Sequence, residues 1–521
     1  MSVRDLLLAR ADDPSTGLLA GAERLTWAEV VRAAAVRAAV LDDLLPDDGP
    51  QHVGLLLDNV PEFLHVLGGA ALGGRVVVGL NTTRRGSALA DDVRRSDTRV
   101  VLTDAAHAGL LDGLDLEVPV VRVDSADWAG LLGRHQGAPV PSAEVGADDL
   151  VMLIFTSGTS GRPKAVNVTH AKVAGPGVLL AQRFGLTGTD VAYLSMPLFH
   201  SNAIMAGWAV GLAAGAALAL APRFSASGFL PDVRRYGATY ATYVGKPLTY
   251  VLATPAAPDD ADNPLRLVFG NEANERDIAA FAERFGCVVV DSYSSTENAV
   301  IVQRVPDMPA GALGRPLEGV AVLDPETMTP TPDAVFGPGG ELLNAKAATG
   351  ELVNTTGGGA FAGYYRDPDS EAERMRGGMY WSGDLAYRDA AGFVYFAGRT
   401  SDWLRVDGEN LAAAPVERVL LRHPAVAEAA VYAVADPSVG DQVAAALVLR
   451  GTLTPAALEA HLAAQPDLSP KAWPRAVRLV ATLPRTATNK VLKRELSGLP
   501  GGFDWAREER GTAYRDLLDR V

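Results

Sequence analysis

The chain has 521 residues, of which 48% are apolar and 21% charged. This length exceeds the size at which a single hydrophobic core stops growing, so we expect two or more domains in a folded globular protein. A net charge of −15 argues against sequence-independent nucleic-acid binding, which needs clustered Lys and Arg. The single cysteine, Cys287, is expected to be buried in a strand, and it cannot form an intrachain disulfide. The single cysteine and the lack of an export signal in MSVRDLLLARADD favour a reducing, cytoplasmic location.

The first half of the chain alternates short apolar runs with amphipathic helical patterns. A typical helical spacer is WAEVVRAAAVRAAVLDDLL, and the apolar runs are HVGLLLD, GRVVVGL, TRVVLTD, DLVMLIF, AALALAP and LRLVFG. Such alternation is typical of crossover units, in which helices cover parallel strands. We therefore predict an α/β fold whose large N-terminal domain consists of helix-covered, mostly parallel sheets.

A loop of hydroxyl residues and glycines, FTSGTSGRPKA at residues 155–165, ends in a lysine. Small residues allow backbone N–H groups to approach an anion, so the loop predicts a phosphate site, with a flexible polar turn as the alternative. It departs from a Walker A loop, because Pro163 and Ala165 stand where that motif has Gly and Ser or Thr. Without a hydroxyl after Lys164, a metal ligand must come from elsewhere in the chain.

The uncharged stretch AIMAGWAVGLAAGAALALA, residues 203–221, is long enough to raise the question of a membrane span. Its glycines Gly207, Gly211 and Gly215 have the four-residue spacing found where transmembrane helices pack. The stretch is mostly Ala and Gly, however, and divides into a helix ending at Gly215 and an apolar strand before Pro222. We therefore favour a buried helix and strand over a transmembrane segment.

The character of the sequence changes at about residue 311. Gly, Pro and short alternating runs such as GELVNT, MYWSGDLAY and GFVYFAG predict a β-rich subdomain over about 311–398. Beyond a boundary near residue 400, a helix, two strands and a second helix predict a small α+β C-terminal domain. The charged tail at 499–521 is expected to be helical and peripheral.

Four further segments occur in order at predicted strand ends or loops: MPLFHSNA (196–203), DSYSSTEN (291–298), WSGDLAY (381–387) and LPRTATNKVLKREL (483–496). With the hydroxyl-rich loop and GRTSDWLRVDGENL, they resemble the motif series of the adenylate-forming superfamily. That superfamily contains acyl-CoA synthetases, luciferases and the adenylation domains of peptide synthetases. The resemblance extends over essentially the whole chain to about Leu496.

Two more segments point to a branch of the superfamily. YGATYATYVGKPLTYVL and FGNEANERDIAAFAERFG are similar to actinobacterial fatty-acid and steroid-acid CoA ligases. These belong to the very-long-chain acyl-CoA synthetase and fatty-acid transport protein branch. Other members of the superfamily more often carry Gly-Gly or Gly-Glu-Pro where Gly270, Asn271 and Glu272 stand here.

The resemblance implies a domain arrangement and a reaction. The N-terminal domain would span 1–398, a hinge 399–403, and a mobile C-terminal domain 404–498. The family's reaction joins a carboxylic acid to ATP as an acyl-adenylate, releases pyrophosphate, and then lets a thiol displace AMP. ATP and coenzyme A are therefore expected as co-substrates, and Mg²⁺ is expected as a cofactor.

The resemblance also implies the residues that bind the nucleotide. The hydroxyl-rich loop would shield the β- and γ-phosphates, the ring of Tyr293 would face adenine, and Asp384 would accept the ribose hydroxyls. The implied cofactor-binding residues are Thr156, Ser157, Gly158, Thr159, Ser160, Lys164, Gly270, Asn271, Glu272, Tyr293, Ser294, Asp384, Arg399 and Gly408. Gly408 would line the pantetheine tunnel, where a side chain would block it.

The implied catalytic residues are Lys490, Thr296, Glu297 and His200. The Lys490 ammonium would bridge the substrate carboxylate and the α-phosphate, Thr296 would donate to that phosphate, and Glu297 would bind Mg²⁺. His200 would gate the acyl pocket, with a structural histidine as the alternative. Asn489 replaces the usual Gly, although Asn also tolerates a left-handed backbone. The hinge position has Ser401, where the family usually has Asp or Lys.

The predicted function is therefore an ATP-dependent acid:CoA ligase for a long-chain fatty acid or a steroid side-chain carboxylate. Small residues at Ala241 and Gly245 suggest a roomy acyl wall. One alternative is an acyl-AMP ligase that loads a carrier protein, and another is a non-catalytic lipid-binding or transport protein. The retained Lys490, Glu297 and Asp384 argue against the second alternative. No nucleic-acid partner or transmembrane segment is expected, and a homodimer is left open.

Overall fold

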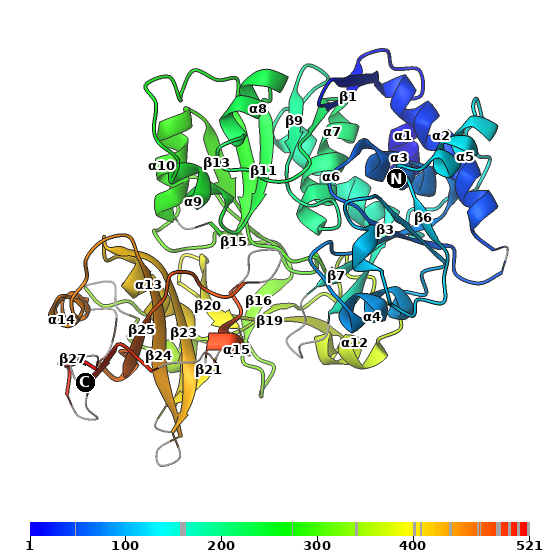
Figure 1. The fold of residues 1–521 in the computed structure, drawn as a ribbon. Helices are drawn as coiled ribbons and strands as arrows, with labels where there is room; N and C mark the ends of the chain where they lie inside the picture. The colour runs from blue at the N-terminus through cyan, green and yellow to red at the C-terminus, as the bar shows by residue number, and fades with distance from the viewer. Residues whose placement is uncertain are drawn as a thin grey trace. The chain divides into compact units, whose positions relative to one another are not determined.

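The computed structural model describes most of the chain and divides it into two compact units. The described residues are 1–46, 48–156, 163–273, 275–338, 342–399, 403–406, 409–436, 440–465, 468, 470–485, 491–496, 498, 502–507 and 511–517. Unit 1 comprises Met1–Ala299 and Ala360–Glu373, and unit 2 comprises Val300–Gly359 and Arg374–Val521. Figure 1 shows the elements of both units along the chain.

A seven-stranded sheet in unit 1 has the order β13-β12-β11-β9-β10-β1-β2. Its strands are β1 (Thr16–Ala20), β2 (Glu23–Thr26), β9 (Val191–Leu194), β10 (Ala217–Leu220), β11 (Tyr240–Val244), β12 (Leu267–Asn271) and β13 (Val288–Asp291). Every neighbouring pair is parallel except β1 and β2, which form an antiparallel edge. The carboxyl ends of the parallel strands therefore meet at one edge of the sheet.

A six-stranded sheet in the same unit has the order β6-β5-β3-β4-β7-β8. Its strands are β3 (His52–Leu56), β4 (Val76–Gly79), β5 (Val100–Thr103), β6 (Val120–Arg122), β7 (Leu150–Thr156) and β8 (Lys164–Thr169). All pairs are parallel except β7 and β8, which form an antiparallel hairpin. The six apolar runs of the sequence all form strands of these two sheets, which confirms the predicted helix-covered, mostly parallel architecture.

The helices of unit 1 bury apolar side chains in its core clusters, except α12, which has no buried residue. They are α1 (Val3–Leu8), α2 (Trp27–Leu44), α3 (Pro61–Gly73), α4 (Ser87–Arg95), α5 (Ala126–Arg134), α6 (His170–Arg183), α7 (Ala209–Ala214), α8 (Phe229–Tyr236), α9 (Pro247–Leu252), α10 (Glu275–Phe285) and α12 (Pro368–Arg374), with a 3₁₀ turn at Ala108–Leu110. Helix α2 begins with a capping box, in which the Thr26 hydroxyl accepts from the Glu29 N–H and the Glu29 carboxylate accepts from the Thr26 N–H. Its inner face, which includes Trp27 and Val31, joins the largest core cluster.

The uncharged stretch at 203–221 is a helix followed by a strand, as predicted. A π-helical segment, η2 (Asn202–Trp208), continues into α7, which ends at Gly215 with φ of 72°. The chain then enters β10 between two parallel neighbours. Within the described part of the chain, no helix is long and apolar enough to cross a membrane.

Unit 2 is rich in strands, as predicted for the region after residue 311. Its first sheet contains β16 (Val320–Leu323), β17 (Gly350–Asn354), β18 (Met375–Arg376), β19 (Met379–Arg388) and β20 (Val394–Arg399). A short pair, β14 (Val302–Gln303) and β15 (Arg315–Pro316), and helix α11 (Ala345–Ala348) accompany it. These strands pair antiparallel to one another.

The second sheet of unit 2 belongs to the C-terminal α+β region. Its strands are β21 (Trp403–Val406), β22 (Glu409–Ala412), β23 (Val426–Asp436), β24 (Gly440–Leu449), β25 (Ala476–Leu479), β26 (Trp505–Arg507) and β27 (Tyr514–Asp516). Its helices are α13 (Ala413–Leu421), α14 (Pro455–Ala463) and α15 (Lys493–Leu496), with a 3₁₀ turn at Pro470–Ala472. The predicted helix, two strands and helix correspond to α13, β23, β24 and α14.

The tail after residue 498 differs from the prediction of a peripheral helix. It contributes β26 and β27, which extend the sheet beyond β25. Trp505 and Tyr514 are buried in the core cluster of this region, and the Tyr514 hydroxyl donates to the Pro474 carbonyl at 2.6 Å. The charged residues suggested a solvated helix, but burial of the two aromatic side chains ties this segment to the sheet.

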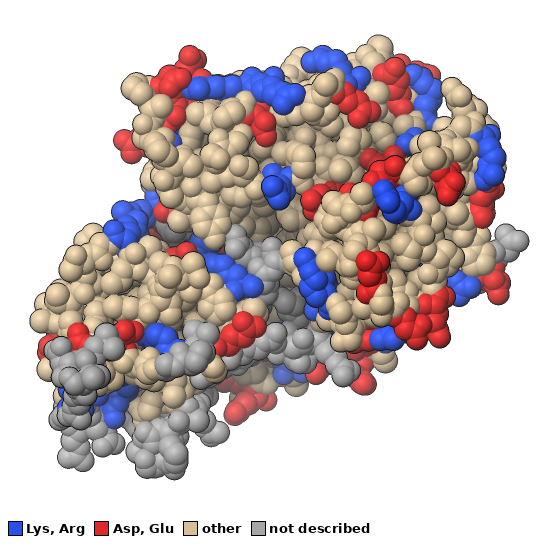
Figure 2. All heavy atoms as spheres, viewed as in Figure 1, with Lys and Arg blue, Asp and Glu red and all other residues tan. Residues whose placement is uncertain are grey.

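Two smaller predictions concern side chains rather than elements. Cys287 is buried and directly precedes β13, and burial raises the pKa of its thiol to about 11, which fits a structural residue. On the face drawn in Figure 2, acidic and basic side chains of the described residues are interspersed rather than gathered into one basic surface.

Candidate active site

The predicted motifs of unit 1 lie at the carboxyl ends of neighbouring parallel strands. The segment with His200 follows β9, Gly245 follows β11, Glu272 follows β12, and the segment with Thr296 and Glu297 follows β13. Ligands of open α/β sheets bind outside this edge, because the loops that leave adjacent strands converge there. The topology therefore brings together residues that are up to a hundred positions apart in the sequence.

The end of β12 approaches β11 so closely that only glycine fits at position 270. A Cβ atom there would lie 2.5 Å from Cδ1 of Tyr243 and closer still to the Tyr243 carbonyl oxygen. Asn271 donates from Nδ2 to the Ser292 carbonyl at 2.6 Å, and its own carbonyl accepts from the Gly245 N–H at 2.9 Å. Glu272 has φ of 69°, in the left-handed region. The predicted adenine-binding backbone is thus a tight turn tied to both neighbouring strand ends.

The segment after β13 carries the predicted Tyr293, Ser294 and Thr296. The Ser294 hydroxyl donates to Asn298 Oδ1 at 3.0 Å, within the turn that follows Tyr293. The Thr296 hydroxyl lies 3.0 Å from the Ser201 hydroxyl, which follows β9, and both side chains are buried. This hydrogen bond joins two of the predicted motifs.

The residues before η2 are held in a similar way. The Asn202 N–H donates to His200 Nδ1 at 3.3 Å, and Asn202 Nδ2 donates to the Tyr243 carbonyl at 3.3 Å. The Tyr243 hydroxyl in turn donates to Asp291 Oδ2 at 2.6 Å. His200 is therefore joined through Asn202 to the end of β11.

Glu297, the predicted metal ligand, is buried and has partners from two other segments. Its Oε1 atom accepts a hydrogen bond of 2.8 Å from the hydroxyl of Tyr364. Lys172 on α6 is also buried, and burial lowers the pKa of its ammonium to about 8 although the nearby Glu297 charge opposes the shift. The Lys172 Nζ atom donates to the Asn167 carbonyl at 3.3 Å. The Glu297 carboxylate is thus placed near the Lys172 ammonium and bonded to the Tyr364 hydroxyl.

The two ends of the predicted phosphate loop face each other across the β7–β8 hairpin. Thr156 and Lys164 are paired in its register. Lys164 is only 3% exposed, and its Nζ atom lies 3.2 Å from a Glu373 carboxylate oxygen and 5.2 Å from the Tyr364 ring centroid. Ser157, Gly158, Thr159 and Ser160 lie outside the described residues.

Unit 2 carries the predicted ribose-binding pair on adjacent strands. Asp384 on β19 is buried and lies opposite Arg399 of β20 in the antiparallel register. The preceding Gly383 N–H donates to Glu351 Oε1 at 2.6 Å, and burial raises the pKa of that glutamate. Three predicted residues of this unit, Ser401, Gly408 and Lys490, lie outside the described residues.

Ala241, expected to line a roomy acyl wall, is fully buried in a core cluster. Ala241 lies in the core cluster that includes Val268 and Phe281, so its side chain faces the helices α8 and α10 rather than η2. Side chains alternate between the two faces of a strand, so Thr242 is the neighbour that faces the opposite side. The small residue at 241 therefore allows close packing of this core cluster.

Two residues of this cluster were not predicted from the sequence. Tyr364 is one of two adjacent tyrosines ahead of Arg366, and nothing local to that pair distinguishes it from a packing residue. On sequence alone, Lys172 is expected to be a solvent-exposed helix residue, because a lone lysine in a helix is normally exposed. Only the tertiary contacts with Glu297 reveal them.

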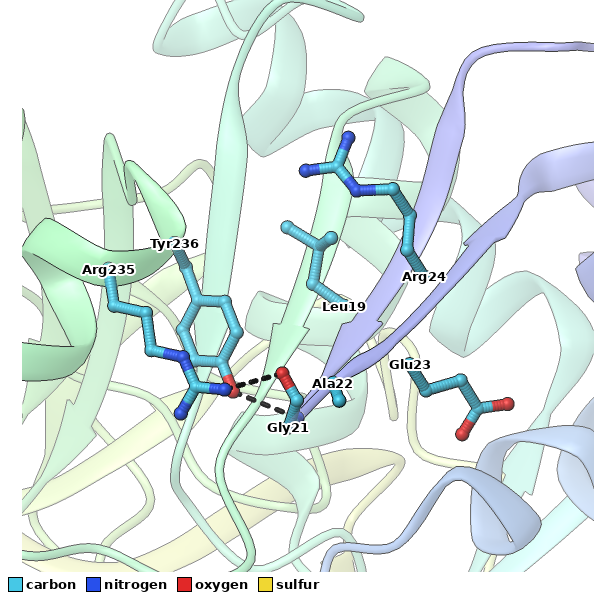
Figure 3. Close-up of a pocket in the computed structure, with 7 residues that line it drawn as sticks. All are labelled: Leu19, Gly21, Ala22, Glu23, Arg24, Arg235 and Tyr236. Atoms are coloured by element: carbon cyan, nitrogen blue, oxygen red, sulfur yellow. Dashed lines mark hydrogen bonds between the residues drawn. The ribbon is translucent and has the colours of Figure 1, made fainter.

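A small pocket of unit 1 contains none of the predicted site residues. It has a volume of about 160 Å³ and is lined by Leu19, Gly21, Ala22, Glu23, Arg24, Arg235 and Tyr236 (Figure 3). The Gly21 N–H donates to the Tyr236 hydroxyl at 3.0 Å, and Arg235 donates to the Gly21 carbonyl at 2.6 Å. These bonds fasten the β1–β2 turn to the end of α8.

Two models of known protein families match the chain. The family described as "AMP-binding enzyme" matches residues 9–365, and "AMP-binding enzyme C-terminal domain" matches residues 415–490. The chain belongs to the AMP-binding enzyme family. Membership confirms the predicted superfamily and, with it, the predicted enzyme class, an AMP-forming acid–thiol ligase.

Similar members of the AMP-binding family match along nearly the whole chain. The Medium/long-chain-fatty-acid–CoA ligase FadD17 of Mycobacterium marinum is 52% identical over 502 residues, covering 95% of this chain and 96% of the relative. The Steroid-22-oyl-CoA synthetase of Rhodococcus jostii is 47% identical over 502 residues, covering 95% and 90%. The crystal structure of ATP-bound MatB from Rhodopseudomonas palustris has a TM-score of 0.82 and 25% identity, covering 96% of this chain and 99% of that one. These matches confirm the predicted fold class.

The residues around Glu297 fit the Mg²⁺ that AMP-binding CoA ligases use. The carboxylate and the neighbouring Thr296 hydroxyl offer oxygen atoms, which are the ligands that Mg²⁺ prefers. No group of three or more His, Cys, Asp or Glu able to hold a metal occurs among the described residues. Mg²⁺ commonly binds through one or two carboxylates, water and substrate phosphates, so a single glutamate suits this ion.

Proposed function

We propose that the protein joins coenzyme A to a medium- or long-chain fatty acid or a steroid side-chain carboxylic acid, at the expense of ATP. The relatives named for these two kinds of acid support the substrate class. The observation that carries the reaction is the buried Thr296–Glu297 pair at the carboxyl end of β13. Ser201 and Tyr364 hold that pair from separate segments.

In the first half-reaction, an oxygen of the substrate carboxylate attacks the α-phosphorus of ATP. The new C–O–P bond forms as the bond between the α-phosphorus and its bridging oxygen breaks, and pyrophosphate leaves with that oxygen. Thr296 donates to the α-phosphate, the Lys490 ammonium bridges the two anions, and the loop from Thr156 to Lys164 surrounds the pyrophosphate. Bound at Glu297, Mg²⁺ supplies positive charge that offsets the charge of the phosphates.

Other residues hold the nucleotide without taking part in bond changes. Tyr293 stacks on adenine against the backbone of residues 270–272, and Ser294 shapes the same turn. Asp384 and Arg399 bind the ribose hydroxyls, because an ionised carboxylate can accept from both hydroxyls at once.

In the second half-reaction, the coenzyme A thiol loses its proton to solvent water and its sulfur attacks the acyl carbonyl carbon. The bond from that carbon to the phosphate oxygen breaks, which releases AMP and leaves the thioester. The C-terminal domain at 404–498 turns about the hinge at 399–403, where Ser401 absorbs the backbone change. Gly408 lines the pantetheine tunnel, and His200 gates the acyl group. The proposal places the enzyme in the cytoplasm, where both ATP and coenzyme A are available.

The test is a panel of carboxylic acids assayed for pyrophosphate release with and without coenzyme A. Acetate, octanoate, palmitate and a steroid side-chain acid cover the range of sizes. We expect the larger acids to give acyl-CoA, AMP and pyrophosphate in equal amounts by mass spectrometry, and acetate to give none. Equal turnover of acetate and the steroid acid would contradict the substrate class. Adenylate formation without transfer to coenzyme A would favour the acyl-AMP ligase.

A Lys490→Ala variant tests the assignment of the first half-reaction. We expect acyl-adenylate formation to fall about 10³-fold, because the variant lacks the charge that stabilises the transition state. Transfer from a supplied acyl-adenylate to coenzyme A should survive. An equal loss of both steps would show that Lys490 has another role.

A further inference from the structure

Tyr364 belongs to a short segment, residues 360–373, that returns to unit 1 between two stretches of unit 2. This segment runs along the hairpin strand β8. The Asn167 N–H donates to the Gly363 carbonyl at 3.1 Å, and the Tyr365 N–H donates to the Ala165 carbonyl at 2.8 Å. Backbone pairing on both sides of Tyr364 fixes its position beside β8.

The side chain of Tyr364 is fixed at both its ring and its hydroxyl. It is 3% exposed, and its ring packs edge to face with Phe361 at a centroid distance of 5.0 Å. The Lys164 ammonium lies 5.2 Å from the ring centroid, a distance at which cation and ring attract each other. From this position the hydroxyl donates to Glu297 Oε1 at 2.8 Å. The ring contacts therefore aim the hydroxyl at the carboxylate.

Carboxylates that bind metals are commonly oriented by hydrogen bonds from residues that do not touch the metal. A donor on one oxygen restricts rotation of the carboxylate plane and fixes the direction of the other oxygen. We propose that Tyr364 is a positioning residue for Glu297, and that it orients this carboxylate for Mg²⁺ bound together with ATP. The inference rests on the proposed role of Glu297.

The adjacent tyrosine provides a matched control. The Tyr365 hydroxyl also donates to a carboxylate oxygen, Asp97 Oδ2, at 2.7 Å. Its ring also makes an edge-to-face contact, with His52 at 5.0 Å. Replacement of either tyrosine by phenylalanine removes one hydroxyl that donates to a carboxylate, but only Tyr364 bonds to Glu297. The two variants thus differ mainly in which carboxylate loses its donor.

The experiment measures Mn²⁺ binding to the full-length protein in the presence of ATP and without acid, by electron paramagnetic resonance. We expect Tyr364→Phe to weaken Mn²⁺ binding about 10-fold to 100-fold, the usual effect of removing such an orienting bond. The ring contacts with Lys164 and Phe361 persist in this variant. Tyr365→Phe should bind Mn²⁺ as the wild type does. Equal Mn²⁺ affinity of the two variants, with both folded by thermal melting, would overturn the inference.

A second cycle separates positioning from a general structural role. In a Glu297→Gln background, adding Tyr364→Phe should cause no further loss of Mn²⁺ affinity, because the carboxylate it orients is gone. A further loss of 10-fold would overturn the inference. The same preparations are tested for acyl-CoA formation with the acid panel. Wild-type protein that binds Mn²⁺ with ATP but forms no acyl-CoA would refute the proposed function. The effect of Tyr364→Phe on Mn²⁺ binding would still test the positioning role. Wild-type protein that does not bind Mn²⁺ with ATP would refute both.

Discussion

The two sheets of unit 1 contribute to the candidate site in different ways. The seven-stranded sheet supplies residues from the ends of separate strands, and long-range bonds such as Ser201 to Thr296 and Asn271 to Ser292 tie them together. The six-stranded sheet supplies a single antiparallel hairpin, whose Lys164 is buried but pairs with the exposed Glu373. The strand-end cluster therefore depends on topology, whereas the hairpin is a local structure. Changes in the cluster should accordingly have the larger effects.

The largest effect is expected for Glu297→Gln, which keeps the shape of the side chain but removes its charge. We expect the rate of acyl-adenylate formation to fall about 10²-fold to 10³-fold, the range found when one preorganised electrostatic group is lost. Pyrophosphate release at saturating ATP measures this rate. Glu62→Gln is the control, because Glu62 is a partly buried partner of Arg37 at 2.6 Å in a different part of unit 1. A comparable loss in the control would show a general effect on the fold.

A smaller but clear effect is expected for Gly270→Ala at the end of β12. The added methyl group would meet the ring and carbonyl of Tyr243, so the strand ends must move apart. Overpacking of this kind usually lowers the free energy of unfolding by about 1–3 kcal/mol, and it should also weaken ATP binding. Urea denaturation and ATP titration measure the two quantities.

Gly130→Ala is the matched control for this substitution. Gly130 lies in α5 and is exposed, and among the described residues an added Cβ would meet nothing within 4 Å beyond its chain neighbours. Replacing glycine by alanine within a helix stabilises it by roughly 0.5–1 kcal/mol. If both variants were destabilised equally, close packing at the end of β12 would not be the cause.

Two buried histidines make the helices around the six-stranded sheet sensitive to acid. Among the described residues, neither ring nitrogen of His65 on α3 or of His170 at the start of α6 has a hydrogen-bond partner, and burial lowers the pKa of each ring to about 4. Because the unfolded chain binds these protons near pH 6.5, their contribution to stability is present above that pH and is lost as the pH falls toward 4. Each histidine should reduce the free energy of unfolding by about 2 kcal/mol as the pH falls from 7.5 to 5.

Urea denaturation at the two pH values measures this loss, and hydrogen exchange locates it. Amides of α3 and α6 should lose protection at pH 5 before those of β12 and β13. A double variant, His65→Gln with His170→Asn, should flatten the pH dependence. An unchanged dependence in that variant would assign the effect to other groups.

Much of this architecture could be predicted from the sequence, because its signals are local. Alternating apolar runs and helical spacers identify six strands of the two sheets, and the glycine at 215 marks the end of α7 with φ of 72°. The ordered motifs place Thr296 and Glu297 after a strand, where β13 ends. Such features depend on hydrophobic periodicity and turn chemistry within a few residues.

The partners of these residues could not be predicted, because they are set by tertiary packing. Tyr364 reaches Glu297 only because the segment around it pairs with β8. The direction of Ala241 depends on which face of β11 meets η2, and its neighbours Tyr240 and Thr242 do not distinguish the two faces. The tail was expected to be helical because many of its residues are charged. Its two aromatic residues, Trp505 and Tyr514, are nevertheless buried in the core cluster of the C-terminal region.

The smallest effect is expected for Glu373→Gln, which tests the local character of the hairpin. The Glu373 side chain is 68% exposed, whereas that of Lys164 is 4% exposed. An ion pair with one exposed partner usually contributes about 0–1 kcal/mol, because water and salt screen it. We expect the free energy of unfolding to change by less than about 0.5 kcal/mol and ATP affinity by less than about 2-fold. Since Lys164 would keep its contact with the Tyr364 ring, the ammonium should remain in place. A clearly larger loss of ATP affinity would instead mean that Glu373 acts on the strand-end cluster through Lys164, and the hairpin would not be a purely local structure.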